Sequence, residues 1–363
     1  MISLESGVGN YITSNGKPYS YFAGNNYLGL ANHPKLITAA TDALGKYGVN
    51  FSASRQTTGT SDIHLELEKL LAEFKDRQDA VVFASGYLGN RLLLHALKDE
   101  YAAIFTDSMA HPSIMDGTPK DIAMLSTYGH CNSDHLESLL KKSKNYRPLI
   151  ITDGVFALTG EIAPIDQIYV LAEKYNALLI VDDAHGTGVL GENGKGTPEH
   201  FGLAGAENIY QSETMSKALG AYGGFISSGK ELIRNIRSKS AFYGASTALP
   251  PPIVAAGCAA LRIIKQTPEL RKNLMLNAEL LRKGLHTLDF ETIDGITPII
   301  PLFFQDKQKA KDLSNFLKEN KIIAPAVEYP VALDKFIVRI TVSTNHSMEQ
   351  INNLLEILKK WRR

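Results

Sequence analysis

This chain has few cysteines and no net charge. Its 363 residues include only two cysteines, and 38 basic side chains balance 38 acidic ones. Cys131 and Cys258 have no metal-like spacing and cannot build a disulfide framework, which is typical of a protein from a reducing cytosol. The even charge gives no electrostatic reason to bind nucleic acid or an anionic membrane surface.

Long apolar runs are also missing. No stretch approaches the roughly 20 residues that a membrane-spanning helix needs. The start of the chain, MISLESGVGNYITSNGKPYSY, lacks both the basic and the apolar region of a secretory signal. Internal repeats, low-complexity tracts and flexible linkers are absent as well. We therefore predict a cytoplasmic globular protein, long enough for a large core that is divided between two domains.

Strand-like and helix-like segments alternate through most of the chain. The segment DIHLELEKLLAEF (62–74) predicts an amphipathic helix, with Ser61 as its N-cap, because its apolar residues recur on one helical face. Strands apolar on both faces that alternate with helices predict an α/β fold, with a mainly parallel sheet between layers of helices. The predicted strands are AVVFAS (80–85), AAIFT (102–106), RPLIIT (147–152), ALLIVD (177–182) and GGFISS (223–228).

The pattern changes near residue 250. Residues 248–285 read as two long helices introduced by a proline turn, and a short strand, helix and strand follow. The chain closes on a helical segment, SMEQINNLLEILKKW. We predict an N-terminal segment (1–30), a large domain (31–250) and a smaller C-terminal α+β domain (251–363).

A glycine pattern in LLIVDDAHGTGVLG (178–191) raises the question of a dinucleotide site. Gly186, Gly188 and Gly191 spell G-x-G-x-x-G after a strand, but such a fingerprint needs a helix to follow it. The next residues, ENGKGTPEHFG, contain helix breakers that cost about 1 kcal/mol for each glycine and about 3 kcal/mol for an interior proline. The pattern therefore favours a loop over a dinucleotide site.

Asp182 ends the strand before these glycines, at the edge where parallel α/β sheets place ligands. A buried carboxylate needs a partner, and a protonated heterocyclic nitrogen would be one; the alternative is an aspartate that only braces the loop. Lys217 follows among the hydroxyl residues of SETMSKALGAYGG (212–224). Withdrawn from water, such a lysine has a lowered pKa and can form an imine with an aldehyde; the alternative is an ordinary surface lysine.

Together, Asp182 and Lys217 suit pyridoxal 5'-phosphate. The lysine would hold the aldehyde carbon, and the carboxylate would keep the pyridine nitrogen protonated, so that the ring can act as an electron sink. His185, three residues after Asp182, could reach the phenolic oxygen of the same ring.

Segments along nearly the whole chain carry a specific resemblance. They are NNYLGLANHP (25–34), SASRQTTGTSDIHLELE (52–68), VVFASGYLGN (81–90), DSMAHPSIMDG (107–117), TDGVFALTGEIAPI (152–165), VDDAHGTGVLGENGKG (181–196), ETMSKALGAYGG (213–224) and VRITVSTNHS (338–347). In order and spacing they resemble the α-oxoamine synthases, fold-type-I pyridoxal phosphate enzymes that join an amino acid to an acyl-CoA with loss of carbon dioxide. The resemblance implies a mainly parallel central sheet of the seven-stranded type, flanked by helices.

The resemblance also assigns roles around the cofactor. Lys217 would form the Schiff base and later remove the Cα proton, Asp182 would pair with the pyridine N–H, and His185 would contact the phenolic oxygen. His111 would stack on the ring. The phosphate would be bound by Ser85, Gly86, Tyr87 and Thr214, together with Ser246 and Thr247 of a partner subunit.

Substrate binding and assembly are implied in the same way. Arg339, a charged residue in the apolar strand-like segment FIVRITVS, would clamp the amino acid's carboxylate through its guanidinium. Asn25 would help to hold the same group. The resemblance further implies a homodimer with composite active sites, and an acyl-CoA or an acyl-carrier thioester as the second substrate.

The chain departs from the family pattern at several points. Position 157 is alanine, where the family usually has a serine that donates a hydrogen bond, and the family's M-D-G-D reads Leu158-Thr159-Gly160-Glu161. The chain also begins close to NNYLGL, without the N-terminal helical extension that supplies an arginine for the pimeloyl carboxylate in 8-amino-7-oxononanoate synthases. Lys17 or Arg55 could replace that arginine.

Several activities stay open at this point. Within the family, the sequence favours a biotin-pathway synthase or a similar enzyme, over glycine C-acetyltransferase, a serine palmitoyltransferase-like enzyme or a synthase with a specialised product. A fold-type-I aminotransferase or aldolase would share Lys217 and Asp182 but need no thioester. A non-catalytic pyridoxal-binding regulator is the remaining alternative.

Overall fold

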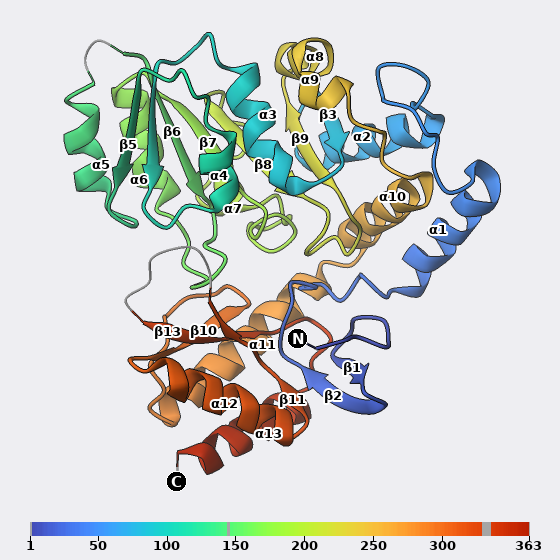
Figure 1. Cartoon of the computed structure of the whole chain (residues 1–363), viewed down its shortest axis with the longest axis vertical. Coiled ribbons are helices and arrows are strands. Elements are labelled where there is room, and N and C mark those ends of the chain that lie inside the picture. The colour runs from blue at the N-terminus through green and yellow to red at the C-terminus, as the bar shows by residue number, and fades with distance from the viewer. Residues whose placement is uncertain (1, 144–145, 329–334, 363) are drawn as a thin grey trace.

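The computed structural model describes residues 2–143, 146–328 and 335–362, which form two lobes (Figure 1). The upper lobe contains a large central sheet with helices around it, and the lower lobe contains two small sheets and three helices near the C-terminus. None of the helices within the described ranges combines the length and the apolar character that crossing a membrane requires.

The central sheet confirms the predicted α/β fold. In the described part of the chain it has seven strands in the order β3-β9-β8-β7-β6-β4-β5, and β5, β4, β6, β7 and β8 are parallel. The strand β9 is antiparallel to both of its neighbours, which makes the sheet mainly rather than wholly parallel. Its strands are β3 (Asp79–Phe83), β4 (Ala103–Asp107), β5 (Met124–Tyr128), β6 (Pro148–Asp153), β7 (Leu178–Asp182), β8 (Ile209–Thr214) and β9 (Gly224–Ser228).

Helices cover both faces of this sheet because its inner strands are apolar on both sides. Along β6, Leu149 and Ile151 belong to a core cluster with α3 and α8, whereas Ile150 belongs to a second cluster with α5 and α6. The helices of the upper lobe are α1 (Pro34–Tyr47), α2 (Asp62–Phe74), η1 (Gly86–Leu88), α3 (Gly89–Ala96), α4 (Pro112–Gly117), α5 (Ser133–Leu140), α6 (Ile165–Lys174), α7 (Thr197–His200), α8 (Lys230–Lys239), α9 (Ala241–Gly244) and α10 (Pro251–Gln266).

The lower lobe combines both ends of the chain. Its strands form the sheets β10-β13-β12 and β1-β2-β11, so the N-terminal hairpin pairs with a strand from the C-terminal third. Its elements are β1 (Tyr11–Ser14), β2 (Lys17–Tyr21), α11 (Glu269–Thr287), β10 (Ile299–Phe304), α12 (Lys307–Glu319), β11 (Ile322–Ile323), β12 (Ala326–Val327), β13 (Phe336–Thr341) and α13 (Met348–Trp361).

The domain boundaries at residues 30 and 250 stay a prediction. The two long helices expected after residue 248 are α10 and α11. The first packs against α1 and α2, and the second packs against α13 (Figure 1). We therefore propose that α10 belongs with the upper lobe and that the chain passes to the lower lobe between α10 and α11.

Candidate active site

The candidate site lies where the parallel strands of the central sheet end. Asp153 and Asp182 are the last residues of β6 and β7, and they pair in register across the two strands. The next strand, β8, ends at Thr214, so Lys217 follows within one turn. The carboxyl edge of a parallel sheet is the usual ligand site in such folds, and the structure brings the predicted aspartate and lysine to it.

Lys217 is the candidate nucleophile. Its Nζ lies 2.8 Å from Nε2 of His185. Burial lowers the pKa of Lys217 to about 8, although the carboxylates of Asp182 and Asp153 oppose this shift. A larger fraction of free amine is therefore present near neutral pH than for an ordinary lysine, and the free amine is the form that attacks an aldehyde.

Asp182 is a buried acceptor that still has room for another donor. Its Oδ2 accepts a 2.6 Å hydrogen bond from Nδ2 of Asn90, and its Oδ1 accepts one of 3.2 Å from the backbone N–H of Ala184. An ionised carboxylate has about four acceptor positions, so a protonated ring nitrogen could fill another. The sequence analysis did not predict a role for Asn90. The only indication in the sequence is that Asn90 is a polar residue near the start of an otherwise apolar helix, just after the turn at Ser85.

His111 lies at the start of α4, after β4. Its backbone N–H donates to Oδ2 of Asp153 at 2.8 Å, and its Nδ1 lies 2.7 Å from Oγ of Ser113. The ring of Tyr87 meets it edge-on, with 5.8 Å between the ring centroids. Burial lowers the pKa of His111, although Asp182 opposes the shift, so the ring is held mainly neutral. Its stacking on a cofactor ring stays a prediction.

A continuous chain of hydrogen bonds runs from Lys217 to Arg339. His185 contacts Lys217 through Nε2, and its Nδ1 lies 2.6 Å from the hydroxyl of Tyr27. The same hydroxyl lies 3.2 Å from Oδ1 of Asn25, which also accepts a 3.0 Å bond from Nη2 of Arg339. Burial and the positive charge of Lys217 hold the pKa of His185 well below its usual range, so its imidazole is neutral in this chain of contacts. Tyr27 is a further site residue that sequence reasoning did not identify.

Arg339 is anchored by neutral groups. Its Nε donates to the backbone oxygen of Ala157 at 2.7 Å, and its Nη1 donates to Oγ1 of Thr341 at 2.8 Å. Its side chain is largely buried in β13, yet no carboxylate within the described ranges forms an ion pair with it. A buried guanidinium without a counter-charge favours an anion, which fits the predicted carboxylate clamp with Asn25.

The turn that was predicted to bind phosphate packs closely on β8. The side chain of Ser85 caps η1 by accepting from the backbone N–H of Tyr87 at 3.3 Å. A Cβ added to Gly86 would lie 2.7 Å from Cβ of Thr214, so glycine is required for this approach. Thr214 donates its own hydroxyl proton to the carbonyl of Gly223 at 3.0 Å. A phosphate contact from Ser85, Gly86, Tyr87 or Thr214 stays a prediction.

Ser246 and Thr247 lie in the segment after α9. The hydroxyl of Ser246 donates to the carbonyl of Phe242 at 2.5 Å, and Thr247 is exposed and forms an isolated β-bridge with Ser54. The exposure of Thr247 is compatible with reaching a partner subunit, and that role for both residues stays a prediction.

The two bases that could replace a missing arginine have different surroundings. Arg55 is buried and forms a 2.9 Å ion pair with Glu68, so its charge is already compensated. Lys17 is exposed at the start of β2. Of the two, only Lys17 has its charge available to a substrate without breaking a buried ion pair.

The residues present fit pyridoxal phosphate. Lys217 offers an amine of lowered pKa, and Asp182 offers a buried acceptor held by Asn90. The amide oxygen of Asn90 is buried and has no hydrogen-bond partner among the described residues. It is therefore a hydrogen-bond acceptor that a bound ligand could use.

Comparisons with known proteins identify the family of the chain. Residues 19–358 match the model of the family described as aminotransferase class I and II. The chain is 40% identical over 360 residues to 8-amino-7-oxononanoate synthase of Thermoanaerobacter pseudethanolicus, covering 98% of this chain and 91% of that protein. It is 38% identical over 359 residues to 8-amino-7-oxononanoate synthase 1 of Bacillus subtilis, with 98% and 91% covered.

Solved structures give the same picture. Serine palmitoyltransferase of Sphingomonas wittichii superposes with a TM-score of 0.93 at 26% identity, covering 99% of this chain and 91% of that one. The structure of 8-amino-7-oxononanoate synthase from Francisella tularensis gives a TM-score of 0.80 at 28% identity, with 94% and 97% covered. The chain therefore belongs to the aminotransferase class I and II family and, among its fold-type-I enzymes, to the α-oxoamine synthases.

Proposed function

We propose that this protein is a pyridoxal phosphate-dependent C-acyltransferase that condenses a small amino acid with an acyl-CoA thioester, in the manner of an 8-amino-7-oxononanoate synthase. The hydrogen-bonded chain from Lys217 to Arg339 is the observation that carries the proposal, because it places a reactive amine and a carboxylate-binding cation in one site. Relatives named 8-amino-7-oxononanoate synthase, which match nearly the whole chain, support the same reaction.

The overall reaction exchanges one carbon–carbon bond for another. A bond forms between Cα of the amino acid and the acyl carbon, and the acyl carbon–sulfur bond breaks to release the CoA thiol. The bond from Cα to the carboxylate breaks to release carbon dioxide, and a proton returns to Cα in place of the one removed. One proton taken up from water completes the thiol, so the products are an aminoketone, carbon dioxide and the thiol. Bound pyridoxal phosphate would supply the electron sink that lets a bond to Cα break heterolytically.

The residues of the chain would divide the work around Cα. Lys217 would hold the cofactor's aldehyde carbon, and its amine, with a pKa of about 8, would also be suited to act as the base that takes the Cα proton near neutral pH. Asp182 would accept the pyridine N–H, and His185 is held by Tyr27 toward Lys217. Burial around these groups excludes water from the reacting carbon.

Arg339 would decide which bond to Cα breaks. Because Nε and Nη1 are fixed on Ala157 and Thr341, the guanidinium has one orientation toward the site. A carboxylate bound to it would be fixed in turn, and this would orient the bonds to Cα of the amino acid. The backbone carbonyl of Ala157 takes part here, although its side chain lacks the serine hydroxyl of the family pattern.

A matrix of substrates tests the reaction. Alanine, glycine and serine are each combined with pimeloyl-, acetyl- and palmitoyl-CoA, and the free thiol and carbon dioxide are measured. We expect release of both in equal amounts with alanine, and none with Lys217→Ala. Preference for glycine with acetyl-CoA, or for serine with palmitoyl-CoA, would assign a different member of the family. Exchange with a ketoacid and no thiol release would contradict the proposal.

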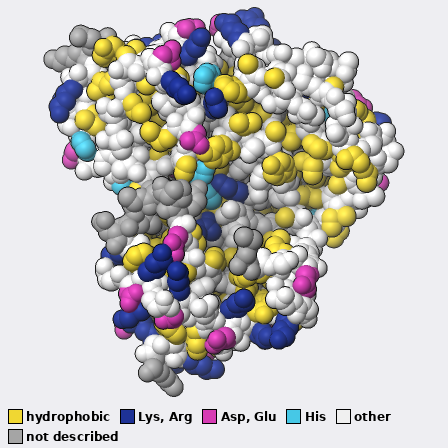
Figure 2. Space-filling model, in the orientation of Figure 1, with side chains coloured by type: hydrophobic (Ala, Val, Ile, Leu, Met, Phe, Trp, Pro, Cys, Tyr) yellow, Lys and Arg dark blue, Asp and Glu magenta, His cyan; other side chains and the backbone are white. Residues whose placement is uncertain are grey.

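We also propose that the active form is a homodimer in the cytoplasm. The helix α1 buries Leu36 and Ala43 but exposes Ile37 and Leu44, which lie about two turns apart on another side of the helix. Figure 2 shows hydrophobic side chains gathered on the side of the upper lobe where α1 lies in Figure 1. A helix that is apolar on two faces favours burial on both. The free thiols Cys131 and Cys258 support a reducing compartment.

Light scattering of the eluting protein checks the assembly. We expect the wild type to have twice the mass of one chain. The double variant Ile37→Asp/Leu44→Asp should have the mass of a single chain and should lose turnover. An active monomer would contradict the proposed homodimer while leaving the reaction untouched.

A further inference from the structure

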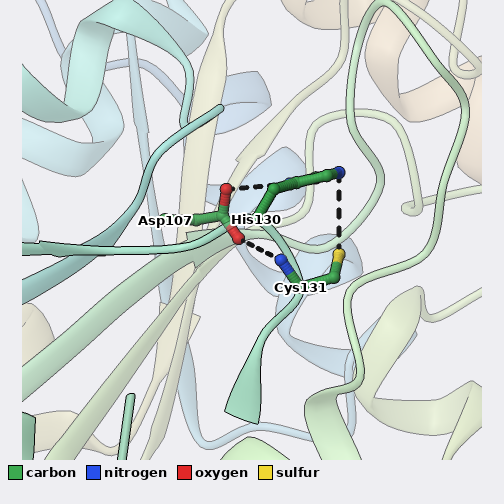
Figure 3. A group of neighbouring side chains, drawn as sticks. All are labelled: Asp107, His130 and Cys131. Carbon is green, nitrogen blue, oxygen red and sulfur yellow. Dashed lines mark hydrogen bonds and ion pairs between the residues drawn. The ribbon is translucent and has the colours of Figure 1, made fainter. Parts of the chain in front are cut away.

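A second cluster of reactive side chains lies outside the residues assigned to the reaction. Asp107 ends β4, His130 and Cys131 follow β5, and Glu161 lies in the segment between β6 and α6. One ligand atom from each of Asp107, His130 and Cys131 lies within 4.8 Å of the other two (Figure 3). None of these side chains has a role in the proposed condensation.

Asp107 fixes the orientation of the His130 ring. Its Oδ1 lies 2.9 Å from Nδ1 of His130, and its two oxygens also accept the backbone N–H groups of Met109 and Cys131, each at 2.8 Å. Because Asp107 already accepts from these two backbone groups and faces Nδ1, we assign it to orienting the ring of His130 and not to binding the cation. A carboxylate behind a histidine in this arrangement is how proteins commonly orient a metal-binding imidazole.

The other ring nitrogen faces two candidate ligands. Nε2 of His130 lies 3.8 Å from Sγ of Cys131 and 3.1 Å from Oε2 of Glu161. A tetrahedral zinc ion, with its usual bond lengths to nitrogen, oxygen and sulfur, would separate these atoms by about 3.6 Å and about 3.4 Å respectively. The observed separations differ from these by only a few tenths of an ångström.

The backbone brings the consecutive side chains together. Cys131 has a φ of 50°, in the left-handed region that a residue other than glycine rarely adopts. Its N–H bond to Asp107 stabilises this conformation, and in Figure 3 its sulfur faces the ring nitrogen of His130 that is farther from Asp107. The edge of the His130 ring packs on Phe156, with 4.4 Å between the centroids, and this contact limits rotation of the ring.

We propose that His130 Nε2, Cys131 Sγ and the carboxylate of Glu161 bind a divalent cation with the chemistry of zinc. One nitrogen, one thiolate and one carboxylate suit a borderline-soft cation and not magnesium or calcium. The His130 and Glu161 side chains are 21% and 31% exposed, so a cation can enter and water can complete a tetrahedral shell.

A bound cation would take the lone pairs of Nε2 and Sγ, and any proton that either atom carries would be released on binding.

The site joins two loops that border the candidate active site. Glu161 lies in the same loop as Ala157, whose carbonyl accepts from Arg339, and Asp107 lies four residues before His111. A cation held between Glu161 and the His130–Cys131 pair would brace these loops against each other. Its role would be structural, since it lies outside the reacting groups.

Zinc retention by the purified protein, freed of any affinity tag and saturated with pyridoxal phosphate, tests the proposal. The protein is incubated with zinc, passed through gel filtration and assayed for zinc by atomic emission. We expect about one zinc per chain for the wild type and for Cys258→Ala, which removes the buried cysteine of α10. Cys131→Ser and Glu161→Gln should each weaken zinc binding by about tenfold or more.

Cobalt gives a second readout that does not depend on activity. Cobalt bound to the wild type should show a thiolate-to-metal charge-transfer band, which Cys131→Ser removes while its circular dichroism stays native. If Cys131→Ser does not fold, Glu161→Gln decides the matter through zinc affinity alone. A wild type that retains no zinc, or zinc that is retained equally by both variants, would overturn the proposal.

Discussion

The hydroxyl oxygen of Tyr27 lies 2.6 Å from Nδ1 of His185, deep in the interior of the protein. Through this contact the histidine that faces Lys217 is joined to Asn25 and Arg339. Tyr27 comes from the segment before α1, His185 from the loop after β7, and Arg339 from β13 of the lower lobe. The candidate site is therefore assembled from both lobes, and its chemistry depends on how they are held together.

Replacing Tyr27 with phenylalanine tests this link. Phe fills the same space but removes the hydroxyl, and a hydrogen bond of this kind contributes about 0.5–1.5 kcal/mol. We expect kcat/KM to fall by about three- to tenfold. Tyr101→Phe is the control, because Tyr101 is also buried and donates one hydrogen bond, to the carbonyl of Leu94 at 2.9 Å. Equal losses of turnover in the two variants would show that Tyr27 acts only through stability.

Arg339→Lys separates carboxylate binding from chemistry. Lysine keeps a positive charge but cannot bond Ala157, Thr341 and a bidentate carboxylate together. We expect KM for the amino acid to rise by about 10- to 100-fold, the range for hydrogen bonds to charged groups, with little change in KM for the acyl-CoA. Arg262→Lys, in an exposed pair with Glu66, should leave both constants unchanged. If only the KM for the acyl-CoA rose, Arg339 would bind the acyl-CoA and not the amino acid.

Two glycine substitutions of opposite effect test the turn before α3. In Gly86→Ala the new Cβ would lie 2.7 Å from Cβ and 2.9 Å from Oγ1 of Thr214, so the turn must shift. We expect a loss of about 1–3 kcal/mol in the free energy of unfolding, measured in denaturant, and weaker binding of pyridoxal phosphate. Gly45→Ala, inside α1 with no atom within 4 Å of its new Cβ, should instead stabilise by up to about 1 kcal/mol. Similar effects at both positions would contradict the tight packing of the turn.

The pH dependence of cofactor capture follows from the lysine. Burial lowers the pKa of Lys217 to about 8, and only the free amine reacts. Below that pH, the initial rate at which the cofactor-free protein captures pyridoxal phosphate should rise about tenfold for each pH unit, and above it the rate should level off. Stopped-flow absorbance measures this rate. If the rate kept rising with pH up to the pKa of an ordinary lysine, the lowered pKa of Lys217 would be contradicted.

The sequence predicted the strands whose residues are apolar on both faces. The segments at 80–85, 102–106, 147–152, 177–182 and 223–228 correspond to β3, β4, β6, β7 and β9, with shifts of one or two residues at their ends. Two strands of the same sheet were missed. In β5 (Met124–Tyr128) half-buried and exposed residues alternate up to Thr127, so this strand is not apolar on both faces. In β8 (Ile209–Thr214) polar side chains are buried, since Gln211 and Thr214 have partners inside the protein.

The candidate site was predicted only where local sequence carries the signal. Asp182 ends one strand, Lys217 follows another, and both stand among distinctive neighbours, so the amino-acid pattern alone was enough to propose their roles. Asn90 and Tyr27 look like ordinary helix and loop residues. Their partners lie 92 and 158 positions away along the chain, and only the fold brings them together. Asp153 is similar, because its importance comes from its register with Asp182 across two strands.

The most direct test concerns Lys217 itself. Protein loaded with pyridoxal phosphate is reduced with borohydride, digested, and mapped by mass spectrometry for lysines that carry a pyridoxyl group. The account predicts one modified lysine, Lys217, with no modification in Lys217→Ala and an unchanged pattern in Lys35→Ala on the surface of α1. A pyridoxyl group on another lysine of the native protein, or on none, would contradict it.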